Sequence, residues 1–215
     1  ADRLAREYTI ECNLGRPQVN YREGIIGKTT YREIYKKQFG GKGKYAELEF
    51  ELSGEPFDNV GLNFENLVGK AVSKDIISAT EKGFRSAMQN GVIAGYTVLN
   101  AHVRLLDVVT HPVDSDALSF EIAASIAFKE ACKNLKIVLL EPIMRLEIIS
   151  PIEYIGEITS DITRRRGEIL NIEGEDVYQV IRAEAPLAEL FGYVTILRSL
   201  SSGRASVNME FKRYA

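Results

Sequence analysis

The order of short strand-like and helix-like segments in the second half of the chain constrains the fold more than any other feature of the sequence. Gly167 follows one helical pattern, Pro186 opens another, and Gly203 follows the end of the second, as helix termini favour. Apolar periodicity predicts strand, helix, strand, strand, helix and strand, in that order, at Ile143–Ile149, Glu153–Arg166, Glu168–Ile172, Val177–Ala185, Leu187–Leu200 and Ser206–Lys212. This order is typical of a ferredoxin-like βαββαβ domain.

The first half carries its own sheet and helix signals. In Tyr45–Leu52 apolar residues alternate with glutamates, which predicts a half-buried strand. Asp75–Asn90 has the pattern of a helix, with Ser73 as a suitable N-cap. Tyr96–Leu106 alternates again, with Asn100, His102 and Arg104 on the polar face, and we expect His102 to face solvent. After a polar loop, a helix containing regularly spaced alanines runs to Leu135. We therefore expect an α+β protein with two sheet-and-helix domains.

Composition narrows the class of protein. The chain has 215 residues and a net charge of -3, so any contact with nucleic acid must come from a local basic patch. It has no apolar run near the roughly 18 residues of a membrane span, and the charged start lacks the apolar core of a secretory signal. Cys12 and Cys132 are predicted to be reduced thiols in the cytoplasm. The uncapped helical pattern that begins at Ala1 suggests a piece cut from a longer protein.

Several catalytic and metal-binding patterns fail on inspection. Gly27, Lys28 and Thr29 would end a phosphate-binding loop only if position 22 were glycine, and that residue is Arg22. The two histidines, His102 and His111, have no neighbouring pattern of cysteines or carboxylates that would complete a metal cage. We predict no catalytic, cofactor-binding or metal-binding residue in this chain.

The acidic residues around His111 allow two interpretations. Asp107, Asp114 and Asp116 flank the histidine and offer the groups that general acid and base catalysis uses. Asp114 and Asp116 also stand where the following helix begins, and helix N-termini favour caps and negative charge. We favour the capping role.

One basic segment remains a candidate binding site. Four lysines occur without an acid in KKQFGGKGK, namely Lys36, Lys37, Lys42 and Lys44, around the glycines Gly40, Gly41 and Gly43. A glycine-rich turn lets backbone N–H groups and lysines approach phosphates, although a solvated hairpin loop explains the segment as well. Two interpretations also apply to the three arginines Arg164, Arg165 and Arg166. They can contact RNA, but cations at a helix C-terminus also complement the helix dipole.

A series of long segments resembles the last domains of the elongation factor G family. In chain order they are GRPQVNYREGI, KKQFGGKGKY, ATEKGFRSAMQNGVIAGY, HPVDSDALSFEIAASIAFKEA, LLEPIMRLEI, RRRGEIL, APLAELFGYVTILRS and SGRASVNMEF. The resemblance covers essentially the whole chain. It implies that residues 1–14 end a third domain, that 15–139 form a fourth domain and that 140–215 form a ferredoxin-like fifth domain. It also implies a ribosomal-protein-like fourth domain with a left-handed βαβ crossover.

The resemblance further implies a role on the ribosome. The tip of the fourth domain would enter the decoding centre and contact transfer and messenger RNA, and the fifth domain would lie near the stalk base and the sarcin–ricin loop. The tip residues that match are Gly40, Gly41, Lys42, Gly43, Lys44, Thr110, His111 and Asp114. Additional RNA contacts are expected from Lys36, Lys37, Arg164, Arg165 and Arg166. GTP and magnesium would bind an N-terminal domain that this stretch does not include, and we expect a cytoplasmic monomer without a membrane partner.

The sequence also departs from the family pattern. Lys44 replaces a usual glutamine, Lys42 an arginine, Ser73 a proline and Ala205 a glycine. Tip contacts can therefore differ in detail, and a diverged paralogue remains open. Two other functions remain as alternatives: a stand-alone RNA-binding regulator of translation, and a phosphotransferase or nuclease of related fold.

Overall fold

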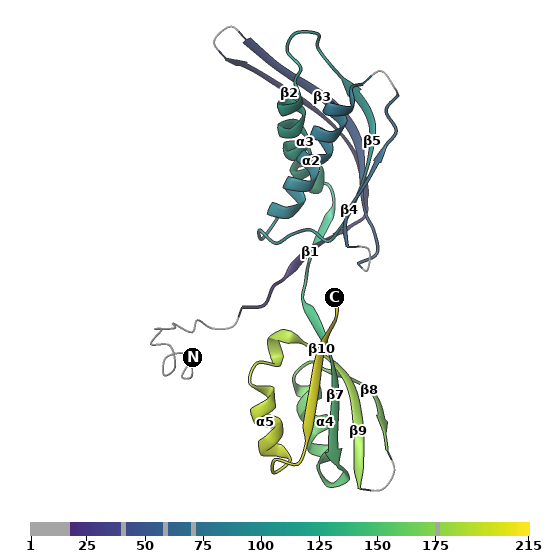
Figure 1. The fold of residues 1–215 in the computed structure, drawn as a ribbon, viewed down its shortest axis with the longest axis vertical. Helices are drawn as coiled ribbons and strands as arrows, with labels where there is room; N and C mark the ends of the chain where they lie inside the picture. Colours follow the sequence, from purple (N-terminus) through teal and green to yellow (C-terminus); the bar gives the residue numbers. More distant parts are fainter. Residues whose placement is uncertain (1–17, 40–41, 58–59, 70–71, 175–176) are drawn as a thin grey trace, which may run out of the picture. The chain divides into compact units, whose positions relative to one another are not determined.

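The protein consists of two compact units (Figure 1). The computed structural model describes residues 18–39, 42–57, 60–69, 72–174 and 177–215. The first unit comprises Tyr21–Pro142 with Arg213–Ala215, and the second is built on Ile143–Lys212. Each unit combines a β-sheet with helices, which confirms the predicted α+β class.

The first unit is a four-stranded sheet with two helices on one face (Figure 1). Its strands lie in the order β2-β3-β5-β4, antiparallel except for the parallel pair of β4 and β5. The connection between that parallel pair contains α2, so these elements form a βαβ crossover. Bounds are β2 Lys28–Phe39, β3 Lys42–Gly54, β4 Gly61–Asn66, α2 Lys74–Asn90, β5 Asn100–Val109 and α3 Ala117–Cys132. A separate antiparallel pair joins β1 (Arg22–Ile26) to β6 (Lys136–Leu140).

The predicted alternation in β3 is confirmed. Its residues Ala46, Leu48, Phe50 and Leu52 are fully buried beneath the helices. The intervening glutamates lie on the opposite face, because successive side chains of a strand point to opposite sides. Ser73 caps α2 as predicted, since its hydroxyl accepts a hydrogen bond from the backbone of Ile76.

Two features of the first unit differ from the sequence-based expectation. The strand β2 was not predicted, because its segment KTTYREIYKKQF carries charged residues at positions on both faces. Asn100 was placed on the polar face of its strand, and this was wrong: the residue is 1% exposed. Its amide oxygen accepts a hydrogen bond from Ile25 N at 2.8 Å, and its amide nitrogen donates to Ile25 O at 3.0 Å. A buried asparagine with these partners ties β1 to β5.

The second unit has the predicted ferredoxin-like order of elements. Its sheet has the order β10-β7-β9-β8, with α4 and α5 packed against it (Figure 1). Bounds are β7 Pro142–Pro151, α4 Ile155–Arg164, β8 Glu168–Glu173, β9 Tyr178–Pro186, α5 Tyr193–Leu200 and β10 Ser206–Tyr214. Both helices begin later than predicted, because short 3-10 turns at Ile152–Tyr154 and Leu187–Glu189 precede them. Within the described ranges, no helix has the length and apolarity that crossing a membrane requires.

Candidate nucleic-acid interface

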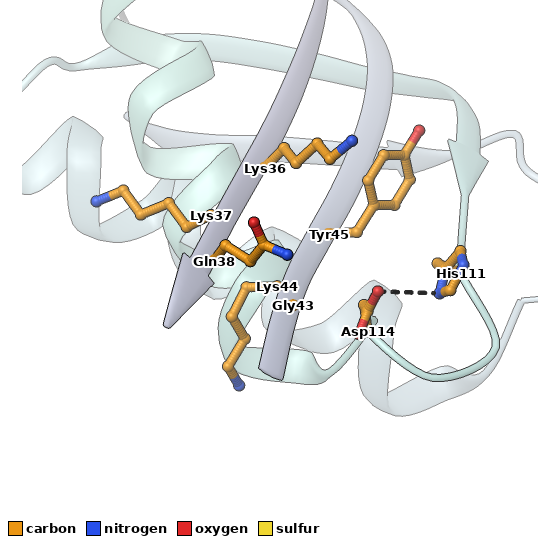
Figure 2. Close-up of a pocket in the computed structure, with 8 residues that line it drawn as sticks. All are labelled: Lys36, Lys37, Gln38, Gly43, Lys44, Tyr45, His111 and Asp114. Atoms are coloured by element: carbon orange, nitrogen blue, oxygen red, sulfur yellow. Dashed lines mark ion pairs between the residues drawn. The ribbon is translucent and has the colours of Figure 1, made fainter. Parts of the chain in front are cut away.

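A polar cavity of about 480 Å³ lies where the β2–β3 hairpin meets the loop between β5 and α3, residues 110–116, which we call the histidine loop (Figure 2). Its lining combines the basic segment with the histidine loop, although these two stretches are far apart in the sequence. The lining residues are Lys36, Lys37, Gln38, Gly43, Lys44, Tyr45, His111 and Asp114. The structure therefore brings together two segments that the sequence analysis singled out separately.

The pairing of β2 with β3 sets the direction of each lysine. Lys37 lies opposite Lys44 in the ladder, and Lys36 lies opposite Tyr45. Cross-strand partners project to the same face and successive residues to opposite faces. Lys37 and Lys44 therefore project to the helix-covered face, while Lys36 and Tyr45 project to the open face (Figure 2).

Hydrogen bonds join the histidine loop to the start of β3. Tyr45 N donates to Asp114 O at 2.8 Å. The Ser115 hydroxyl donates to Tyr45 O at 2.7 Å and accepts from His111 N at 2.8 Å. Because these bonds involve the main chain on both sides, the hairpin and the loop form one local structure.

His111 lines the cavity from the histidine loop. Its Nδ1 is 3.4 Å from the Asp114 carboxylate, and its ring centroid is 6.3 Å from that of Tyr45 (Figure 2). About half of the histidine side chain is exposed, so the ring is accessible to a ligand. The Tyr45 hydroxyl hydrogen bonds to Glu47, and this bond raises the pKa of the tyrosine.

Asp116 connects Lys44 to the start of α3. The ammonium of Lys44 forms an ion pair with the Asp116 carboxylate, which also accepts hydrogen bonds from Ser119 N at 2.8 Å and from the Ser119 hydroxyl at 2.5 Å. The Lys44 contact, followed by those of Ser119, lowers the pKa of Asp116 to about 2. Asp116 is the N-cap of α3, which confirms the predicted capping role for this residue; the Asp114 carboxylate lies beside His111 instead.

Lys36 and Lys37 differ electrostatically from the other cations of the sheet. Arg32 forms ion pairs with three carboxylates on the open face, and Arg104 forms ion pairs with two. In contrast, neither Lys36 nor Lys37 has an ion-pair partner among the residues that the structure describes; Lys37 lies over the Tyr35 ring at 5.6 Å. Positive charge that is not internally neutralised therefore lies at the cavity, despite the net charge of -3.

Some predicted tip residues receive little or no structural description. Gly40 and Gly41 lie outside the described residues, and so does the side chain of Lys42, whose backbone begins β3. Thr110 is described and exposed.

Tyr45 and Gln38 line the cavity but were not predicted. Their signal was their position beside lysines in a hairpin, which becomes visible only once β2 is recognised as a strand.

The structure separates the three arginines at the end of α4. Arg164 is 77% exposed, whereas Arg165 is only 17% exposed. Arg165 Nε lies 2.7 Å from the Asp161 carboxylate, and its Nη1 donates to Glu189 O at 2.6 Å. Arg166 Nε donates to the Glu189 carboxylate at 3.2 Å. Arg165 thus contributes to the packing of its own unit, and Arg164 presents its charge to solvent.

The residues of the rejected catalytic and metal-binding patterns have structural roles. Lys28 begins strand β2 and forms an ion pair with Glu51 at 2.7 Å, so no helix follows it as a phosphate-binding loop requires. His102 was expected to face solvent, but it is largely covered and lies 3.1 Å from the Glu55 carboxylate. In the described part of the chain, no group of three or more His, Cys, Asp and Glu side chains is arranged to hold a metal ion.

Comparisons with known proteins agree with the structure. The family model for elongation factor G domain IV matches residues 17–135, and the model for the elongation factor G C-terminus matches residues 138–215. Elongation factor G of Cytophaga hutchinsonii is 50% identical over 214 residues, which are 99% of this chain and 30% of that protein. Elongation factor G of Karelsulcia muelleri is 49% identical over 215 residues, covering 99% of this chain and 31% of that protein.

A solved structure gives the same result. A crystal structure of a protein from Thermus thermophilus has a TM-score of 0.87 and 36% sequence identity, and the match covers 98% of this chain and 31% of that one. The chain therefore spans about a third of the length of the relatives it matches. The two adjoining family matches, together with the fold, show that this chain belongs to the elongation factor G family.

Proposed function

We propose that this chain is the ribosome-binding arm of an elongation factor G, and that its tip cavity contacts messenger and transfer RNA in the decoding centre during translocation. The observation that carries the proposal is the meeting of Lys36, Lys37 and His111 at one cavity. Neither lysine has an ion-pair partner in the described part of the chain, and such ammonium groups attract phosphates, whose contacts position a protein on RNA without reading its sequence. The exposed imidazole and Tyr45 add rings that can stack on bases.

The proposed role requires a stiff support for the tip. The β2–β3 ladder is continuous from the Lys28–Ser53 pair to the Phe39–Lys42 pair. On its helix-covered face Phe50 of β3 packs against Phe84 of α2, and both rings are fully buried. Close-packed interiors deform little, so force applied at the tip is transmitted to the sheet instead of being absorbed by bending.

We extend the proposal to the domain assignment. Residues 15–139 correspond to the fourth domain and 140–215 to the fifth, with 1–14 as the end of the third. The fifth domain would lie near the sarcin–ricin loop and the stalk base, where the exposed Arg164 is available to ribosomal RNA. GTP and magnesium would bind a part of the longer protein outside this chain, and the factor would act as a monomer in the cytoplasm.

Binding of the 215-residue chain to small ribosomal subunits loaded with messenger and transfer RNA tests the proposal. The double variant Lys36→Gln/Lys37→Gln is compared with Lys74→Gln/Lys129→Gln, which removes the same charge from exposed helix positions. We expect the tip variant to flatten the dependence of log affinity on log salt by roughly 0.7–0.9 for each lysine, and the control to leave it unchanged.

Chemical footprinting of ribosomal RNA on the same complexes locates the contact. Protection of decoding-centre nucleotides by the unaltered chain, lost in the tip variant and kept in the helix control, is the expected result. Equal salt slopes for the two double variants, or protection confined to other regions, would contradict the proposed placement of the tip.

A further inference from the structure

Lys44 differs from Lys36 and Lys37 because its ammonium forms an ion pair within the protein. Its ammonium contacts the carboxylate that caps α3, and the other oxygen of that carboxylate accepts two hydrogen bonds from Ser119. The contact spans 72 positions of sequence. It therefore links the start of β3 to the start of α3, the helix that follows the histidine loop.

We propose that Lys44 is a positioning residue, which together with Asp116 clamps the histidine loop onto the hairpin, and that Lys36 and Lys37 supply the charge for RNA phosphates. This inference rests on the proposed function and assigns its contacts to particular residues. Lys44 thus acts through the placement of His111 and not through its own contact with RNA.

The neighbouring hydrogen bonds show how the clamp reaches His111. Tyr45, next to Lys44, bonds to Asp114 and Ser115, and Ser115 is next to Asp116 and bonds to His111 N. The ion pair therefore continues a row of contacts between two consecutive residues of the hairpin and three of the loop. Loss of the pair releases one end of this row and loosens the backbone that carries His111.

The ion pair of Lys44 with Asp116 has a second structural effect, because it offsets the repulsion between Lys44 and Lys37. Lys37 is directly opposite Lys44 in the ladder, and like charges at opposed positions destabilise a sheet. Asp116 neutralises Lys44 and so removes this repulsion, while Lys37 has no ion-pair partner among the described residues. A phosphate that approached Lys44 would also approach the Asp116 carboxylate, so the pair adds no net charge to binding.

Amide hydrogen exchange of the chain without ribosomes tests the clamp. Tyr45 N–H is the reporter, because it donates to Asp114 O across the joint. We expect Lys44→Gln and Asp116→Asn each to speed this exchange roughly threefold to fivefold, which is the effect of losing one exposed ion pair. The double variant should exchange no faster than either single variant, because both remove the same interaction. Asparagine retains the N-cap, so the variant removes charge without removing the cap. Lys74→Gln, which removes a charge from an exposed position at the start of α2, is the control and should leave this exchange rate unchanged.

Binding to small ribosomal subunits between about 50 and 200 mM salt tests the assignment of charge. Lys44→Gln should weaken binding without changing the salt slope, while Lys36→Gln and Lys37→Gln should each lower the slope by roughly 0.7–0.9. In the Asp116→Asn background, adding Lys44→Gln should cost no further affinity. If Lys44 itself bound an RNA phosphate, adding Lys44→Gln to the Asp116→Asn variant would lower both the affinity and the salt slope. That result would overturn the inference.

The two measurements separate the possible failures. Salt-independent binding, or none, by the unaltered chain would overturn the proposed function and with it the assignment of charge, while exchange alone would decide the clamp. Unchanged Tyr45 exchange in both single variants would overturn the clamp even if the chain bound the subunits with the expected salt dependence.

Discussion

The Asp114 carboxylate lies directly against the backbone of Gly43. A Cβ at Gly43 would stand 2.6 Å from the Asp114 carboxyl carbon, closer than non-bonded atoms approach. The glycine is therefore needed for space rather than for an unusual backbone angle. Since the same carboxylate lies 3.4 Å from His111 Nδ1, the bare backbone at Gly43 determines where the histidine loop rests.

Gly43→Ala should displace Asp114 and loosen the histidine loop. We expect the free energy of unfolding of the first unit to fall by about 1 kcal/mol, because the crowded carboxylate moves at moderate cost. Amide chemical shifts of His111 and Asp114 should change together. Gly69→Ala is the control, since no atom lies within 4 Å of the added Cβ. An unchanged His111 shift in the Gly43 variant would contradict this account.

Gly83→Ala should destabilise the first unit although alanine favours helices. The added Cβ would lie 2.2 Å from the Glu121 backbone oxygen, so α2 and α3 must move apart. Overpacking costs about 1–3 kcal/mol, which exceeds the gain of about 1 kcal/mol in helix propensity. Gly156→Ala in α4 has no atom within 4 Å and should stabilise the second unit by about 0.5–1 kcal/mol. Urea unfolding followed by NMR signals of each unit measures both, and equal signs would contradict the argument.

The pKa of Asp116 should depend on Lys44. The pKa is lowered from 3.8 to about 2, first by Lys44 and then by Ser119. The ionised group therefore stabilises the fold above about pH 4, and this contribution is lost as the pH falls towards 2. Lys44→Gln should move the pKa up towards 3.8, as measured by a carbon-13 titration of the carboxyl group. Lys37→Gln should not move it. A value near 3.8 in the unaltered protein would refute the ion pair.

Glu23→Gln should destabilise the first unit strongly. Glu23 is 1% exposed, and its carboxylate accepts hydrogen bonds from Val92 N at 2.6 Å, Ala94 N at 2.7 Å and Ile93 N at 3.1 Å. A glutamine would turn an N–H₂ group towards some of these donors. We expect a loss of about 3 kcal/mol in unfolding free energy, since buried donors to a charged group lose their acceptor.

Glu157→Gln is the comparison for the Glu23 variant. Glu157 is exposed, so its substitution should change stability by no more than about 0.5 kcal/mol. Urea unfolding of both variants provides the measurement. Similar small losses at the two positions would show that the Glu23 carboxylate does not hold the loop after α2.

The local sequence pattern was sufficient to predict β3 and α2, each of which has one buried face and one solvent-exposed face. The alternation around Leu48 predicted β3, and the helix signals after Ser73 predicted α2, because both depend on neighbours in sequence. Such pattern failed for β2, in which Lys28 and Arg32 form ion pairs with glutamates on the open face of the sheet. It also failed for Asn100, because the sequence does not display the backbone groups that satisfy a buried amide.

The amino-acid order by itself determined the order of strands and helices in the second unit, the family, and the two segments that line the cavity. Only the tertiary structure decided that Lys44 is matched by Asp116 while Lys36 and Lys37 lack an ion-pair partner among the described residues. The physical reason is that charges interact according to distance in space. Strand register and the turn into α3 set the distance between Lys44 and Asp116, which are 72 residues apart in the chain.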